Sequence, residues 1–235
     1  MARLTRKELK SDKFALEVQH SVEYVSEHRR QVIRWGGIGV GVLVVVLAIT
    51  FYRSYEHKAR QQALAEAMRI ENAQVGANPG ANEYTLSFPT DAERVQAANK
   101  AFSGITSKYS GSEEAAIAEY FLGDNAADDG NMAEAEKHLK IASSVSGPFS
   151  AVAKLALAAV YGGEGKLGEG EKLIQSVIDH PNVLVSKEQA TMELAELIEK
   201  TDPQRARKLM EPLRTSSRPN LSRAAVTALG QIPGK

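Results

Sequence analysis

The sequence predicts an all-α protein in which one N-terminal transmembrane helix precedes a solenoid of stacked helical hairpins. Three observations predict this fold class. First, residues 35–52 carry no charge. Second, after residue 110 a pattern of small and large apolar residues recurs with a period near 35 residues. Third, aromatic residues make up only 6% of the 235-residue chain. A low aromatic content together with abundant alanine favours packed helices over sheets.

Composition excludes several function classes. Lysine plus arginine and aspartate plus glutamate both number 29, whereas a nucleic-acid-binding protein needs a basic excess to neutralise phosphates. The chain has no cysteine, which excludes a disulfide scaffold, a cysteine-ligated zinc, an iron–sulfur cluster and a thiol nucleophile. We therefore expect neither nucleic acid nor a small-molecule substrate as a ligand.

The uncharged stretch at residues 35–52 predicts a transmembrane helix. Its 18 residues span about 27 Å as a helix, close to the roughly 30 Å hydrocarbon core of a bilayer. Trp35, Phe51 and Tyr52 stand at its ends, where interfacial aromatic residues belong. A buried core helix is one alternative, but such helices normally keep a polar face. A cleaved signal peptide is another, but its apolar run is usually about 7–15 residues and small residues follow it.

Flanking charge predicts the orientation of this helix. Residues 1–34 carry eight lysines and arginines against five acidic residues, and the 15 residues after the span carry three basic residues. The positive-inside rule then places the N-terminus in the cytoplasm and residues 53–235 outside it. Within residues 1–34, apolar residues at helical spacing predict an amphipathic segment that lies on the membrane, docks on a partner or continues the membrane helix: Phe14, Val18, Val22 and Val25.

The span itself carries a motif for contact with another helix. Gly37 and Gly41 have the Gly-x-x-x-Gly spacing, and Gly36 and Gly39 widen the same groove. Small residues at this spacing let two membrane helices approach closely. The alternative is an anchor that tolerates glycine and has no partner helix.

Residues 53–110 predict a linker helix, a loop and a first helical hairpin. The helix continues beyond the membrane to about residue 75, and glycine, proline and asparagine interrupt it over residues 76–89. Thr90 and Glu93 then form a T-x-x-E capping box, which predicts a helix that ends near Tyr109, before Ser110 and Gly111.

Residues 111–235 contain the repeat and a C-terminal capping helix. Leu122, Gly123, Gly130, Ala135, Leu139 and Ala142 recur about 35 residues later as Leu157, Ala158, Gly165, Gly170, Ile174 and Val177. A more divergent third unit has helices near 187–200 and 204–215, and a last helix near 221–230 caps the stack. A period near 34 residues with helix–turn–helix units is typical of tetratricopeptide repeats, whose hairpins must stack to bury their apolar faces. An irregular helical bundle is the alternative.

Two motifs resemble enzyme or metal sites, and we reject both. Gly163, Gly165 and Gly168 match the G-x-G-x-x-G dinucleotide pattern, but the preceding segment is alanine-rich and helical where that site needs a strand. Residues 125–136 resemble a calcium loop, but Asn125 and Ala127 stand at two ligand positions. The five histidines have no metal-ligand spacing and no catalytic motif occurs. We expect no catalytic residue, no cofactor and no metal.

The first helices of the repeat units are expected to line a concave protein-binding groove. The groove residues are Ile117, Tyr120, Asp124 and Asp128 in the first unit, Val152, Leu155 and Ala159 in the second, and Glu188, Thr191 and Ala195 in the third. This surface mixes apolar area with carboxylates, so we expect an apolar or basic extended segment, or a partner helix, as its ligand. Alternatively, Tyr120 and Leu155 pack into the solenoid, or residues 53–75 or 76–89 fill the groove. Residues 200–235 carry eight basic and two acidic side chains, which form either a solvated face or a patch for anionic partners.

The whole architecture resembles a known family. A short basic segment, a glycine-rich span followed by the run RSYEHKARQQA and degenerate helical repeats are similar to the YfgM-like ancillary subunits of the bacterial Sec translocon. The resemblance covers residues 20–230 and implies a single-pass protein of the bacterial inner membrane with a periplasmic repeat domain. It implies Sec channel subunits and a membrane-anchored periplasmic chaperone of the prolyl-isomerase class as partners.

The sequence therefore predicts a non-enzymatic, membrane-anchored interaction scaffold, and the resemblance implies that it helps the Sec translocon in protein export. The alternative is an assembly factor for another envelope complex, such as outer-membrane insertion or cytochrome maturation.

Overall fold

A computed structural model describes residues 29–76 and 86–232. The predicted amphipathic stripe from Phe14 to Val25 and most of the 76–89 loop lie outside these residues. The chain divides into two compact units after Lys58, and each is described by itself. The described part is helical except for one pair of two-residue strands, as the all-α prediction requires.

The first unit contains the N-terminal part of helix α2 (Arg29–Glu71). This helix is long and apolar enough to cross a membrane. Its large apolar side chains are exposed on all sides, for example Ile38, Leu43 and Leu47. Because no described residue covers them, this segment lacks the buried stripe that a core helix would have.

The second unit begins with the remainder of α2, which packs on α3 (Asp91–Lys108) and α4 (Glu113–Asp128). Ala67 and Phe102 are fully buried in this contact, and Arg60 Nε lies 3.2 Å from Glu114 Oε2. The strands β1 (Gln74–Val75) and β2 (Ser87–Phe88) pair in parallel between α2 and α3. Residues 59–71 are therefore an integral part of the helical domain.

Local sequence signals position the next helices. The Thr90 hydroxyl accepts a hydrogen bond from the Glu93 amide at 3.2 Å, which confirms Thr90 as the N-cap of α3. Ser112 and Asn131 cap α4 and α5 (Met132–Ser144) in the same way. The α4–α5 turn contains Gly130 at φ +76°, and the turn between α6 (Phe149–Gly163) and α7 (Leu167–Asp179) contains Gly165 at φ +78°. Both glycines adopt the left-handed conformation that the predicted turns require.

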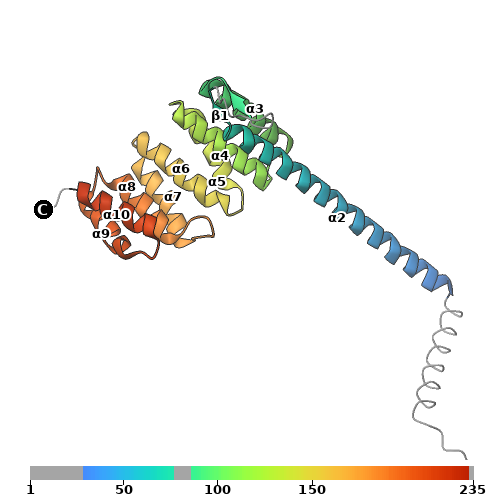
Figure 1. The fold of residues 1–235 in the computed structure, drawn as a ribbon. Coiled ribbons are helices and arrows are strands. Elements are labelled where there is room, and N and C mark those ends of the chain that lie inside the picture. The colour runs from blue at the N-terminus through green and yellow to red at the C-terminus, as the bar shows by residue number, and fades with distance from the viewer. Residues whose placement is uncertain (1–28, 77–85, 233–235) are drawn as a thin grey trace, which may run out of the picture. The chain divides into compact units, whose positions relative to one another are not determined.

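The remaining elements continue the stack to the C-terminus (Figure 1). They are α8 (Lys187–Ile198), α9 (Pro203–Met210), the 3₁₀-helix η1 (Glu211–Thr215) and α10 (Pro219–Gln231). Each helix from α3 to α9 packs on the next one, while α4 also contacts α6 and α6 also contacts α8. This is the arrangement of a solenoid of helical pairs.

Small residues set the distance between the two helices of each pair. A Cβ atom on Gly123 would lie 3.2 Å from the backbone oxygen of Ala135, and one on Gly170 would lie 3.0 Å from that of Ala158. In the α4–α5 pair the glycine at the close contact lies on the first helix, whereas in the α6–α7 pair it lies on the second helix. The large repeat residues Leu139 and Ile174 are at most 2% exposed, which confirms their predicted place in the core.

Candidate protein-binding groove

The first helices of the three pairs lie next to one another and form one face of the solenoid. Helix α6 contacts α4 on one side and α8 on the other. The predicted groove residues of α4 recur at intervals of three or four, so they share one stripe of the helix. Ile117, Tyr120 and Asp124 are half-buried and Asp128 is exposed. We call the surface that α4, α6 and α8 form on this side the inner face.

Tyr120 belongs partly to the inner face and partly to the core. Its ring makes edge-to-face contacts with Phe121 and Phe149, each at 5.2 Å between ring centroids. Phe149 begins α6, so Tyr120 also links two neighbouring pairs. The pKa of its hydroxyl is raised by burial and by the charges of Asp124 and Asp128. Tyr120 therefore packs partly into the solenoid, as the alternative interpretation expects, and leaves the rest of its side chain on the inner face.

Helix α6 supplies the middle of the inner face. Val152 and Leu155 are half-buried and pack against the C-terminal core, while Ala159 is exposed. Among the predicted α6 residues, only Ala159 thus leaves most of its side chain to a ligand. The apolar part of this face is shallow, because its larger side chains also stabilise the solenoid.

On α8 the predicted register is wrong by one residue. Leu194 and Ala195 match Leu122–Gly123 and Leu157–Ala158 of the preceding pairs, and Ala195 is completely buried. Ala195 therefore occupies the small position between paired helices and cannot line a groove. The residues that match the groove positions of α4 and α6 are Gln189, Met192 and Glu196; Met192 is 5% exposed and belongs to the core, so only Gln189 and Glu196 reach the surface.

The other two predicted α8 residues make local contacts. Glu188 Oε2 accepts a hydrogen bond from the Ser216 hydroxyl at 3.2 Å and lies 3.9 Å from Arg218 Nε. The Thr191 hydroxyl donates to the Lys187 carbonyl at 2.8 Å. Gln189 and Glu196 instead line two shallow hollows of about 480 and 460 Å³, each shared with residues of α10 or of the turn before it. Helix α10 therefore flanks this end of the inner face.

The inner face carries carboxylates on α4 and α8, while Arg218 and Arg223 line the hollows at its α10 end. The pKa of Asp124 is raised by burial and then by the charges of Asp128 and Glu71. The pKa of Glu196 is raised by burial and by Glu193 and Glu199. Carboxylates that raise one another's pKa share a negative potential, which favours a cationic ligand.

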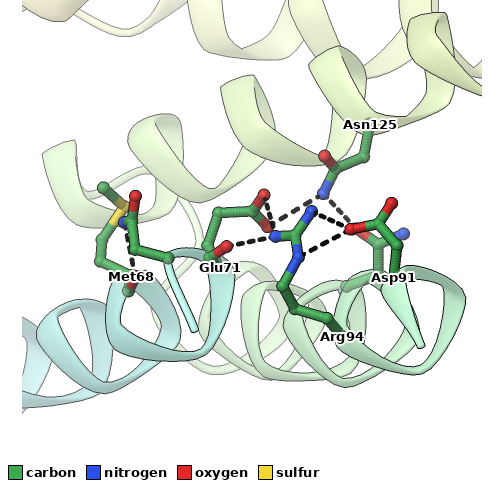
Figure 2. A network of polar contacts seen from close by, with 7 residues as sticks. Met68, Glu71, Asp91, Arg94 and Asn125 are labelled. Carbon is green, nitrogen blue, oxygen red and sulfur yellow. Dashed lines mark hydrogen bonds and ion pairs between the residues drawn. The ribbon is translucent and has the colours of Figure 1, made fainter. Parts of the chain in front are cut away.

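A polar network, absent from the sequence prediction, fixes the end of α2 beside this face (Figure 2). Arg94 Nη1 lies 2.8 Å from Glu71 Oε1 and also donates to the Glu71 carbonyl, while its Nε donates to Asp91 at 3.0 Å. Asn125 Nδ2 donates to Asn99 Oδ1 at 2.9 Å and to Glu71 Oε2 at 3.3 Å. The network joins α2, α3 and α4 through residues that are far apart in the sequence.

Residues 59–71 border the groove. Helix α2 packs on the α4 stripe that contains Ala115, Ala118 and Leu122. The predicted groove residues Ile117, Tyr120 and Asp124 follow these residues by two positions, so the two stripes lie about 160° apart around α4. The α2 segment therefore leaves the Asp124 side of α4 accessible.

The rejected motifs have structural roles. Residues 163–168 run from the end of α6 into the start of α7, so a helix stands directly before them where the dinucleotide pattern needs a strand. Asn125 bonds Asn99 and Glu71, which removes it from any calcium loop. Within residues 29–76 and 86–232, no three histidine, aspartate or glutamate side chains converge as a metal site would require.

Comparison with known proteins supports the repeat interpretation. The sequence profile of the family described as tetratricopeptide repeat-like domain matches residues 32–182. The chain belongs to this family. The match runs from the apolar part of α2 through α7, whereas searches of curated proteins and of solved structures found no match. Domains of this kind are interaction modules, so the chain carries a protein-interaction scaffold.

Proposed function

We propose that this protein is a non-enzymatic, membrane-anchored scaffold that holds a protein partner on the inner face. The observation that supports this proposal is the continuous face of α4, α6 and α8. This face combines half-buried apolar side chains with carboxylates of raised pKa. A solenoid of this kind offers an extended surface for a partner rather than an enclosed catalytic pocket. The apolar helix α2 supplies the anchor.

We further propose that this scaffold assists the Sec translocon in the bacterial inner membrane, with the repeat domain in the periplasm. The charge difference across the apolar span and the resemblance of the RSYEHKARQQA run support this assignment. The partners are then Sec channel subunits and a membrane-anchored periplasmic chaperone. An assembly factor for outer-membrane insertion or cytochrome maturation is the second candidate, because the same repeat scaffold serves either role.

Photo-crosslinking in intact membranes tests this function. A crosslinking amino acid replaces Ala159, which is exposed on the inner face, and in a matched control it replaces Lys137, which is exposed on α5. Crosslinks from position 159 to Sec channel subunits or to the chaperone support the first role. Crosslinks to outer-membrane assembly or haem-handling proteins support the second. Equal yields at both positions would refute the inner face as the binding surface.

A further inference from the structure

The helical domain has a second recess on the side of α6 that faces away from the inner face. It measures about 670 Å³ and lies among α5, α6 and α7. Leu157 and Tyr161 of α6 line it and are 3% and 5% exposed. They follow Leu155 and Ala159 by two positions, which is about 200° around a helix. We call this recess the outer hollow.

The rim of the outer hollow is basic. Lys140 of α5, Lys154 of α6 and Lys172 of α7 line it, against one carboxylate, that of Glu169. Lys140 already pairs with Glu136, whose pKa falls to about 2 because Lys140 and Lys166 both bond it. For Lys154 and Lys172, the described residues supply no carboxylate partner within ion-pair distance. These two ammonium groups therefore have free capacity for an anionic ligand.

The preceding pair shows that the unpaired lysine is particular to this site. Lys154 and Leu173 match Glu119 and His138 in the repeat. Glu119 is buried, and its Oε2 lies 2.5 Å from His138 Nδ1. In the first pair the two polar side chains thus satisfy each other. In the second pair Leu173 stands in place of the histidine, and Lys154 stands in place of the glutamate, beside the recess.

We propose that the outer hollow binds an acidic, extended protein segment that inserts an apolar side chain onto Leu157 and Tyr161. Carboxylates of the segment pair with Lys154 and Lys172, where charge-assisted hydrogen bonds supply both affinity and orientation. The volume lies within the 300–1,000 Å³ range typical of ligand sites. A membrane surface fits less well, because electrostatic lipid binding uses clusters of four to eight protruding cations, whereas here three lysines surround a recess that also contains Glu169. This site is separate from the inner face, so it adds a second partner to the scaffold.

The test uses the full chain in maltoside micelles and a fluorescein-labelled decapeptide that alternates glutamate or aspartate with leucine or phenylalanine. A matched peptide carries glutamine and asparagine in place of the acids. Fluorescence anisotropy should show at least tenfold tighter binding of the acidic peptide, and raising salt from 50 to 300 mM should weaken it. Equal affinity for both peptides would overturn the proposal.

Variants locate the binding site. Lys154→Met together with Lys172→Met should weaken acidic-peptide binding at least tenfold, whereas Lys154→Arg with Lys172→Arg should keep it within threefold. Lys187→Met with Lys200→Met makes the same charge change on exposed residues of α8 and the turn after it, and should change binding less than twofold. Equal losses in the two methionine variants would show unspecific attraction and overturn the proposal. Melting curves from circular dichroism verify that each variant is folded.

Two further measurements test the alternatives, namely that the peptide binds the inner face or that the outer hollow binds a lipid headgroup. Tyr120→Ala with Asp124→Lys alters the inner face and should leave acidic-peptide affinity unchanged, even if the proposed function fails. Loss of peptide binding in that variant would move the peptide to the inner face and overturn the proposal. Displacement of the peptide by a small excess of phosphatidylglycerol in the micelles would assign the hollow to a lipid headgroup, which also overturns it.

Discussion

Adding a single methyl group at Gly123 should destabilise the helical domain. A Cβ atom there would lie 2.6 Å from Leu139 Cγ and 3.2 Å from the Ala135 carbonyl oxygen. Leu139 is 1% exposed, and the close atom is the branch carbon, so the side chain cannot retreat by a simple rotation. The second helix of the pair must therefore move outward when Gly123→Ala is introduced.

Two opposing contributions decide the size of the effect. Alanine is favoured over glycine inside a helix by about 1 kcal/mol. Overpacking a well-packed core costs about 1–3 kcal/mol, and a contact this short against an enclosed side chain belongs in the upper part of that range. The net expectation is a loss of about 1–2 kcal/mol in the free energy of unfolding. For a domain of this size, that lowers the melting temperature by roughly 2–8 °C.

Gly104→Ala is the matched control for this prediction. Gly104 lies within α3 and is exposed, and an added Cβ would meet no atom within 4 Å. This substitution should therefore raise stability by about 0.5–1 kcal/mol. Thermal unfolding of the full chain in micelles, followed by far-ultraviolet circular dichroism, measures both variants. If Gly123→Ala melts at or above the temperature of the wild type while the control behaves as expected, the close approach of α4 and α5 is not what selects glycine.

Four further predictions concern the groove, the anchor and the polar network. Tyr120→Ala with Asp124→Lys should weaken partner capture in membrane pull-downs; because Tyr120 also packs on two phenylalanines, we expect a modest fall in melting temperature, and unchanged capture would exclude the inner face. Asp124→Asn should raise the melting temperature at pH 7, because the raised pKa of Asp124 means that its charged form costs stability in the folded state. The difference in melting temperature between Asp124→Asn and the wild type should shrink as pH falls through the raised pKa of Asp124 toward the unfolded value near 3.9. The reason is that the wild-type carboxyl gains its proton in the folded state at a higher pH than in the unfolded state. A difference that stays constant between pH 7 and pH 4 would contradict the raised pKa of Asp124. Arg94→Met should cost about 2–3 kcal/mol in chemical denaturation, because it leaves a largely buried carboxylate at the end of α2 without its cation, and a loss below 0.5 kcal/mol would show that the network is not stabilising. Gly37→Leu with Gly41→Leu should lower co-purification of a membrane partner without changing insertion, whereas unchanged recovery would leave a simple anchor.

The fold could be predicted where its determinants are local or periodic. Thr90 caps its own helix, and Gly130 and Gly165 make the turns at which they stand. The matching of Leu122–Gly123 with Leu157–Ala158 predicted the contacts within two pairs. In each case the residue that carries the signal is also the residue that makes the contact, so spacing alone is sufficient.

The missed features depend on contacts between distant segments. The register of α8 cannot be derived from the start of the helix, because a helix boundary is defined in sequence only to within one or two residues; the pair Leu194–Ala195 defines it instead. The bonds among Glu71, Arg94 and Asn125 join three helices across 23 and 54 residues. No periodic pattern marks such a network, because each of these side chains also occurs commonly on solvated helix faces.

Helix α6 shows how one short sequence can serve two surfaces. Its Val152, Leu155 and Ala159 face the inner side, and its Lys154 lies about 200° from Val152, at the rim of the outer hollow. The faces are separated by the buried residues Ala151, Ala153 and Ala158, which are small enough to let the neighbouring helices approach. The inner-face residues of α6 do not line the outer hollow, so one helical pair offers separate surfaces for two partners.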